Sequence, residues 1–113
     1  MHEMSLCESI LQILQDEARA KGFQRVREVC LEIGELASVE PEALRFGFDV
    51  VMRGSLADGA RLRIERVPGL AWCMPCGARV LLARRGDACP ACGSYQLQVL
   101  AGDEMRVKEL EVD

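Results

Sequence analysis

The stretch Cys73–Gly93, CMPCGARVLLARRGDACPACG, decides how this chain can fold. It holds four of the six cysteines, as two C-x2-C pairs with twelve residues between them. Two residues between thiolates let both sulfurs reach one ion, and the glycine after each pair permits a tight turn. Four sulfur ligands suit a tetrahedral zinc ion and complete its shell. The spacing therefore predicts a structural zinc site at Cys73, Cys76, Cys89 and Cys92.

Iron is the alternative metal for the same pair of turns, which would make the protein a rubredoxin-like electron carrier. The intervening loop lacks an aromatic shell and carries Arg79, Arg84 and Arg85 instead. A segment this short buries little core, so a metal that orders it is the simplest role. We favour zinc on these grounds, although the spacing itself allows both ions.

The chain outside this stretch alternates between helical and strand patterns. Apolar residues at helical spacing predict a first helix that stops near Gly22, and a second helix is predicted from Pro41 to Gly54. Alternating apolar and charged residues predict strands at Arg25–Gly34, Arg61–Val67, Gln96–Leu100 and Met105–Val112. The expected fold class is α+β, with two helices packed on a small sheet of about three strands.

The cysteine module interrupts this pattern between two neighbouring strands. We expect residues 1–68 and 97–113 to form one α+β domain, with residues 69–96 as an inserted zinc-binding domain of the zinc-ribbon type. A second module in a chain of 113 residues buries too little apolar surface to fold without such a staple.

Composition excludes several classes of function. A formal charge of −4 without a basic run argues against general nucleic-acid binding. The start lacks the pattern of a secretory signal and no apolar stretch has transmembrane length, so we expect a cytoplasmic protein with reduced thiols and no membrane contact. The zinc is saturated, and neither a second histidine nor a glycine-rich phosphate loop is present, so we expect no enzyme.

The start of the chain, Met1-His2-Glu3, offers a second kind of metal site. The Met1 amine, the His2 amide nitrogen and His2 Nδ1 can close adjoining chelate rings, and the Glu3 amide can complete a plane. Square-planar nitrogen ligation suits Ni(II) and Cu(II). Glu3 could also add a carboxylate ligand or an acceptor for the imidazole. On spacing alone a histidine beside a terminus is most often just solvated, so both interpretations stay open.

Several segments together resemble one family. They are MHEMSLCESI, LEIGELASVEPEALRFGFDVV, GARLRIE, the paired C-x2-C turns and GDEMRVKELEV, and they run over essentially the whole chain. In this order they resemble the HypA/HybF hydrogenase maturation proteins.

The resemblance implies nickel bound through Met1, His2 and Glu3, with structural zinc at the four cysteines. Glu40, where many members carry aspartate, is a further candidate ligand. It also implies that the protein is a metallochaperone that delivers nickel with the HypB GTPase to the large subunit of [NiFe]-hydrogenase. Urease maturation factors are further candidate partners, and the expected state is a monomer or a weak homodimer.

The remaining cysteines have simpler interpretations. Cys7 lies on the apolar stripe of the first helix and is expected in the core, and Cys30 is expected to be a structural thiol. The rival function is a zinc-ribbon adaptor that binds protein or nucleic acid through its arginine-rich loop. The acidic balance and the few aromatic residues weigh against it.

Overall fold

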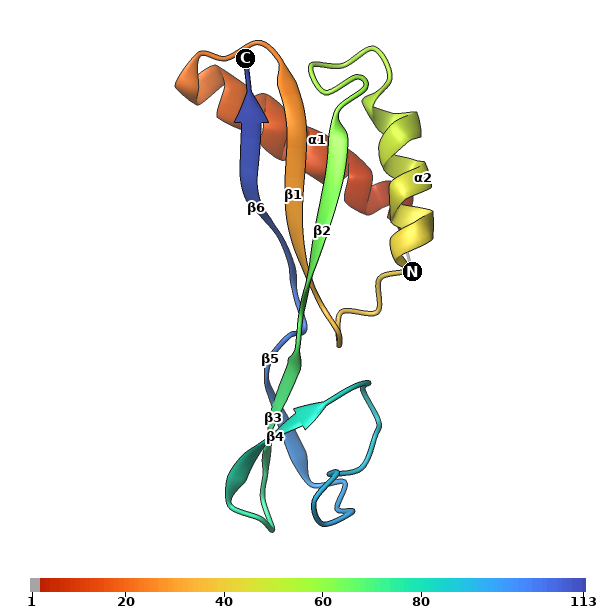
Figure 1. Cartoon of the computed structure of the whole chain (residues 1–113), viewed down its shortest axis with the longest axis vertical. Helices are drawn as coiled ribbons and strands as arrows, with labels where there is room; N and C mark the ends of the chain where they lie inside the picture. Colours follow the sequence, from red (N-terminus) through yellow and green to blue (C-terminus); the bar gives the residue numbers. More distant parts are fainter. Residues whose placement is uncertain (1–2) are drawn as a thin grey trace. The chain divides into compact units, whose positions relative to one another are not determined.

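The computed structural model describes residues 3–113, which cluster into two compact units. Within these residues the first unit comprises residues 3–31, Val39–Ile64 and Val107–Asp113, and the second comprises Glu32–Ser38 and Glu65–Arg106. The elements in chain order (Figure 1) are α1 (Glu3–Lys21), β1 (Val26–Gly34), α2 (Pro41–Met52), β2 (Arg61–Val67), β3 (Gly69–Cys73), β4 (Ala78–Leu82), β5 (Leu97–Ala101) and β6 (Met105–Val112).

The sheet that carries the helices has the strand order β2-β1-β6. Strands β1 and β2 run parallel, because backbone hydrogen bonds connect their like ends. Val26 N donates to Leu56 O, shortly before β2, and Glu35 N donates to Val67 O at the far end. The second helix, α2, is the crossover between them. Strand β6 runs antiparallel to β1, since Asp113 N donates to Arg25 O. The predicted fold class, two helices on a small three-stranded sheet with a cysteine module, is confirmed.

The first helix crosses behind the strands and packs against α2 (Figure 1). Its buried residues are Cys7, Ile10 and Leu14, the apolar stripe that the sequence predicts. Burying a Leu or Ile side chain stabilises the fold by roughly 1.5–3 kcal/mol. Where α1 contacts α2, Gly47 of α2 leaves room for the thiol of Cys7. A Cβ added to Gly47 would lie 3.2 Å from Cys7 Sγ. None of the helices in residues 3–113 is both long and apolar enough to cross a membrane.

Strand β1 is buried more completely than its sequence suggests. Val29, Leu31 and Ile33 face the helices and are fully buried, as expected for a half-buried strand. Cys30 points to the opposite side and is nevertheless only 1% exposed. It lies in a small pocket lined also by Arg63 and Glu109, whose long side chains cover the open face of the sheet.

The second unit contains a separate three-stranded sheet with the order β4-β3-β5. Both β4 and β5 pair antiparallel with β3. Its core is small, with Leu36, Ala71 and Leu82 buried. The sequence predicts a strand at 96–100, close to β5, but gives no signal for β3 and β4. Each has only five residues and adjoins a cysteine turn, too short for a periodic pattern to show.

This second unit is wider than the predicted module at residues 69–96, since it also takes in Glu32–Ser38 and the strand β5. The predicted division into a nickel-binding and a zinc-binding domain concerns function, and it stays a prediction.

Glycines allow the backbone to pass closely within the second unit. A Cβ on Gly34 would lie 2.0 Å from Gly102 O, and one on Gly69 would lie 2.2 Å from Leu82 O. Gly102 combines two constraints, because its φ is +83° and its added Cβ would lie 2.3 Å from Pro68 O. No side chain fits at such distances without moving the backbone.

We expect Gly102→Ala to destabilise the second unit strongly, and Gly86→Ala is the matched control. Gly86 has a similar φ of +88° but no atom within 4 Å of an added Cβ. The backbone strain, about 1–2 kcal/mol, is therefore common to both variants, and Gly102→Ala adds the clash. Denaturant titration of the metal-loaded protein, followed by Trp72 fluorescence, should show a loss larger by at least about 2 kcal/mol for Gly102→Ala. Equal losses would contradict the close backbone passage.

Candidate metal centres

The four cysteines of the module come together as predicted. Cys73 Sγ lies 3.6 Å from Cys92 Sγ, and Cys76 Sγ lies 3.9 Å from Cys89 Sγ. All four sulfurs lie within 4.8 Å of one another. Cys73 and Cys89 are buried, whereas Cys76 and Cys92 are exposed. Among the described residues this is the one group of three or more His, Cys, Asp or Glu side chains close enough to hold a metal ion.

Two equivalent turns position these thiols. Gly77 N donates to Cys73 O at 2.9 Å, and Gly93 N donates to Cys89 O at 2.8 Å. Both glycines have positive φ, +60° and +78°, which explains why glycine follows each pair. In the second turn Ala91 N also points at Cys89 Sγ, at 3.4 Å. The first turn joins β3 to β4, so the sheet holds one pair of sulfurs in place while the second turn brings the other.

The thiols perturb one another. Hydrogen bonds with Cys92 and Cys73, together with burial, raise the pKa of Cys76 to about 12. Burial acts to raise the pKa of Cys89 too, but backbone hydrogen bonds from Cys92 and Ala91 outweigh it and lower that pKa to about 7. A cation must displace the protons of the group to bind four thiolates, so its affinity falls as the pH falls.

The donor set fits a soft or borderline cation that accepts four sulfurs. Zinc meets this requirement and would be fully coordinated, with no position left for a substrate. Its contribution there would be to hold the two turns together. Iron accepts the same donors, so the geometry does not separate the two ions.

The predicted nickel ligands Met1 and His2 lie outside the described residues. Glu3 begins α1, and its Oε2 accepts a hydrogen bond from Glu40 N at 3.2 Å. Glu40 is the N-cap of α2 and its Oε1 accepts from Glu42 N at 3.3 Å. The fold thus brings together Glu3 and Glu40, the two described candidates, although they are 37 residues apart.

Sequence reasoning missed the capping role of Glu40. A partial signal was present, because proline marks the first position of a helix and a negative charge is favourable at a helix N-terminus, although glutamate is not among the preferred capping residues. The contact between Glu3 and Glu40 has no such signal, since it depends on how α1 and α2 pack.

The two other cysteines are buried and lie outside the four-thiol group, in agreement with their predicted roles. The Cys7 thiol contacts Leu44 O at 3.4 Å. Burial, followed by the charges of Glu3 and Glu8, raises the pKa of Cys7 to about 11. A thiol that resists ionisation in this way is a poor metal ligand at neutral pH.

Part of the arginine-rich loop also has a structural role. Arg85 Nε donates to Leu36 O at 3.1 Å, and its guanidinium lies 3.6 Å from Asp103. Arg85 is therefore committed to contacts within the second unit, which weakens the rival interpretation of this loop as a contact for another macromolecule.

Comparisons with known proteins agree over the whole chain. A family described as HypA, hydrogenase/urease nickel incorporation, metallochaperone, matches residues 1–112. The hydrogenase maturation factors HypA of Alkalilimnicola ehrlichii and Azotobacter vinelandii are 67% and 60% identical over 113 residues, each covering all of both chains. The solution structure of the Ni metallochaperone HypA from Helicobacter pylori is similar in fold, with a TM-score of 0.73 at 24% identity, over 99% of this chain and 97% of that one.

Removal of one exposed thiol should empty the four-cysteine site. Cys92→Ala costs little packing because Cys92 is exposed, so its effect reports on the metal. We expect the metal affinity to fall by more than about a hundredfold and the Trp72 environment to loosen, while the helical circular dichroism stays. Metal content per chain after a chelator challenge measures this.

Cys30→Ala is the control, because it removes a buried thiol outside the group. It should lower stability but retain the metal. Full metal content in Cys92→Ala would mean that the ion does not need all four sulfurs.

Proposed function

Because the chain belongs to the HypA family of hydrogenase and urease nickel-incorporation metallochaperones, we propose that it binds Ni(II) at its N-terminus and delivers it during [NiFe]-hydrogenase maturation. The family consists of maturation factors rather than enzymes. Nickel is therefore cargo, and the chemistry required of the chain is selective binding followed by release.

The proposed nickel ligands are the nitrogens of Met1, His2 and Glu3, with the carboxylates of Glu3 and Glu40 nearby. The observation that carries this location is the hydrogen bond from Glu40 N to Glu3 Oε2. It joins the first residue of α1 to the residue that caps α2, so both carboxylate candidates lie at one place in the fold. A square plane of nitrogens suits Ni(II).

Release follows from the same ligands. An amine and an imidazole both take up protons near neutral pH, so protons compete with the metal. A recipient that offers thiolates can then take the ion, since these bind soft and borderline metals more firmly than nitrogen does.

The proposed role of the four-cysteine site is structural, with zinc as its ion. The small core of the second unit, with Leu36, Ala71 and Leu82 buried, supports this role. In this proposal the first unit carries nickel and the second carries zinc. If the protein were purified with iron in this site, the electron-carrier alternative would be favoured instead.

The proposed partners are the HypB GTPase and the large subunit of the hydrogenase. Hydrogenase is favoured as the final recipient because the curated relatives are named hydrogenase maturation factors. The family description also covers urease, so urease maturation factors are the alternative recipients. The proposal places this delivery in the cytoplasm.

His2→Ala should abolish nickel binding and leave zinc and fold intact. A one-residue extension before Met1 should do the same, because it moves the terminal amine away from the imidazole. Calorimetric titration of the untagged protein should show one Ni(II) per chain for the native terminus and none for either variant. Absorbance in the visible range reports the square-planar geometry.

Glu40→Gln removes the negative charge of this side chain but keeps its capping role. The amide oxygen of glutamine can still accept a hydrogen bond from Glu42 N. A reduced nickel affinity would assign a direct contact to Glu40. Nickel retained in both terminal variants would move the site elsewhere. Failure of the native protein to bind nickel would remove the proposal and favour the zinc-ribbon adaptor.

Nickel affinity should also fall with pH. In model peptides an α-amine has a pKa of about 7.7–8 and an imidazole one of about 6.5, and a nitrogen of either kind must lose its proton to bind a metal. Between pH 8 and pH 6 we therefore expect a decrease of about tenfold or more. Titrations in buffers of different ionisation enthalpy would also count the released protons. A constant affinity over this range would rule out the terminal chelate.

A further inference from the structure

The sheet of the second unit has one face in its core and one open face. Along β3, β5 and most of β4 the more buried residues alternate with the more exposed ones, and Ala71, Val80 and Val99 lie on the core side. The residues between them point the other way. The open face therefore consists of Leu70 and Trp72 of β3, Arg79 and Leu81 of β4, and Gln98 and Leu100 of β5.

Strand register gathers three leucines into one row on this open face. Leu70 of β3 lies opposite Leu81 of β4. Leu100 lies on the other side of Leu70, where an extra residue of β5 shifts the register. Leu81 is 67% exposed and Leu100 is 46% exposed. Single exposed leucines are common, but a contiguous apolar row at this exposure indicates a surface that another molecule covers.

A second row, which is polar, lies two residues along the strands, about 7 Å nearer to the first cysteine turn. In it Trp72 of β3 lies between Arg79 of β4 and Gln98 of β5. Trp72 is partly buried and is the one tryptophan of the chain. Within residues 3–113 the Arg79 guanidinium forms neither a salt bridge nor a hydrogen bond. Tryptophan and arginine are the side chains that most often dominate the energy of protein–protein contacts.

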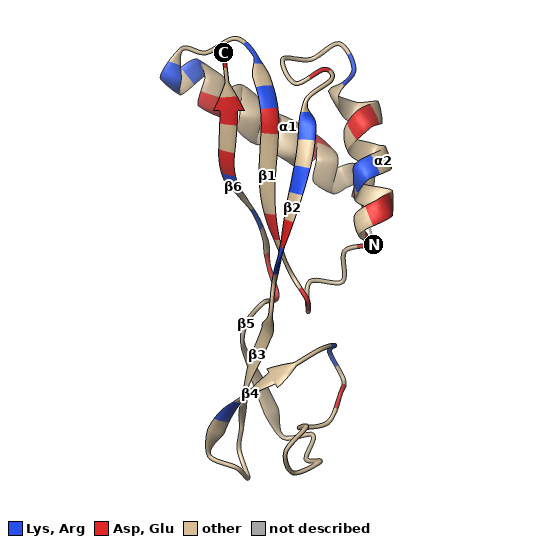
Figure 2. Cartoon of the chain, viewed as in Figure 1, with Lys and Arg blue, Asp and Glu red and all other residues tan. Residues whose placement is uncertain are grey.

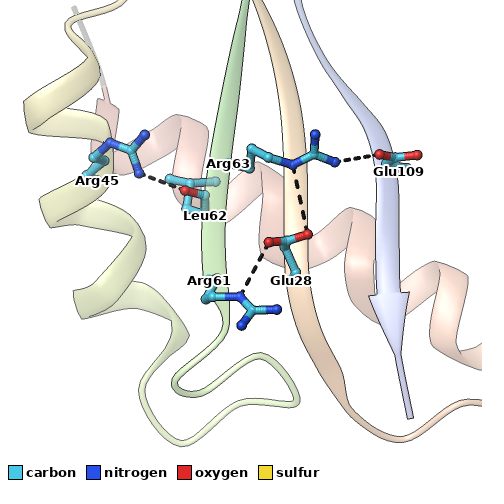
Figure 3. Close-up of polar contacts among 6 residues, drawn as sticks. All are labelled: Glu28, Arg45, Arg61, Leu62, Arg63 and Glu109. Atoms are coloured by element: carbon cyan, nitrogen blue, oxygen red, sulfur yellow. Dashed lines mark hydrogen bonds and ion pairs between the residues drawn. The ribbon is translucent and has the colours of Figure 1, made fainter.

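The sheet of the first unit has an open face of a different kind. Glu28 pairs there with Arg61 and Arg63, and the charges are compensated within the sheet (Figure 3). Arg63 also pairs with Glu109, at 2.6 Å. Strands β3, β4 and β5 carry one charged residue, Arg79, and Figure 2 shows them tan apart from one blue segment on β4. The open face of the second sheet is thus apolar with one uncompensated cation.

We propose that this face binds a segment of another protein that presents apolar side chains to the leucine row and an aspartate or glutamate to Arg79. The carboxylate accepts two parallel hydrogen bonds from the guanidinium, which is the strongest geometry for such a pair. The amide of Gln98 donates to or accepts from the backbone of the segment. The segment covers Trp72 between these contacts and so keeps water from the ion pair.

Other classes of partner fit this face less well. Nucleic acids are held by several phosphate contacts, but Arg79 is the one cation here, in a chain whose formal charge is −4. The same negative charge disfavours an anionic membrane surface. It also repels strongly acidic proteins, so the carboxylate must be a local feature of an otherwise apolar segment.

The contact also adds to the small core of the second unit. That core, with Leu36, Ala71 and Leu82, lies on one side of the sheet. A segment on the open face covers β3 from the other side, and because it binds only the folded unit it stabilises that unit by mass action. The proposal depends neither on nickel binding nor on which ion the four cysteines hold.

Photo-crosslinking from the open face tests for the segment. With p-benzoylphenylalanine in place of Leu81, a photoreactive group lies in the leucine row. The same group in place of Phe46 is the control, because Phe46 of α2 is 69% exposed but lies outside this face. After irradiation of cells that make the protein, mass spectrometry of the adduct reads the crosslinked sequence. We expect a segment with several apolar residues next to an aspartate or glutamate, captured from the Leu81 position alone.

The crosslinked sequence, made as a synthetic peptide, is then titrated against the metal-loaded protein with Trp72 fluorescence as the signal. Arg79→Glu should raise the dissociation constant about tenfold or more, and a peptide with arginine in place of its acidic residue should restore binding to that variant. Arg84→Glu makes the same change of charge outside the sheet and should have no effect. Leu81→Ser should weaken binding about tenfold, whereas Phe46→Ser should not. Metal content and circular dichroism confirm that each variant folds.

The absence of an adduct from the Leu81 position would overturn the proposal. So would an adduct with a second copy of this chain, with a nucleic acid or with a lipid. A peptide whose affinity is the same for Arg79→Glu as for the native protein would equally refute it, because the charge of Arg79 would then have no part in recognition.

Discussion

Burial of strand β1 on both faces is the constraint on which the rest of the structure depends. Its Val29, Leu31 and Ile33 form the floor for the two helices, and Cys30 on the opposite face is covered by charged side chains. The same segment continues to Leu36, which is buried in the core of the second unit. One run of residues therefore supplies buried apolar surface to each unit. A polar substitution within this run would destabilise both units.

The two units offset the conformational entropy lost on folding in different ways. The first has helices with continuous apolar faces and needs no metal to close its core. The core cluster of the second contains three buried apolar residues, far too few to offset the entropy of fixing its loops. The structural zinc ion that we propose would supply the missing free energy, at a pH that lets the four thiols ionise. Under the proposed function, this difference would let one metal serve as cargo at the first unit while another orders the second.

Much of the fold was predictable because its patterns are local. Strands β2 and β6 alternate apolar and charged residues except at one adjacent charged pair in each, and their ends match the predicted ones. The four thiols follow from spacing within one short stretch. Strands β3 and β4 were not predictable, because five residues beside a cysteine turn carry no period. The meeting of Glu3 and Glu40 depends on helix packing across 37 residues, and the burial of Cys30 depends on side chains from two other strands.

The first unit is assembled from three separate segments of the chain, with the cysteine module lying between the second and the third. During synthesis the ribosome must therefore make the entire module before the residues of β6 emerge to flank β1. Until then β1 has one open side, and the nascent chain is exposed to misplaced strand pairing. A module that folds early around its ion would shorten the loop that β6 must close, and so favour the correct partner. If the four-cysteine site takes up its proposed ion at this stage, the supply of that ion would set the yield of correctly folded chains during synthesis.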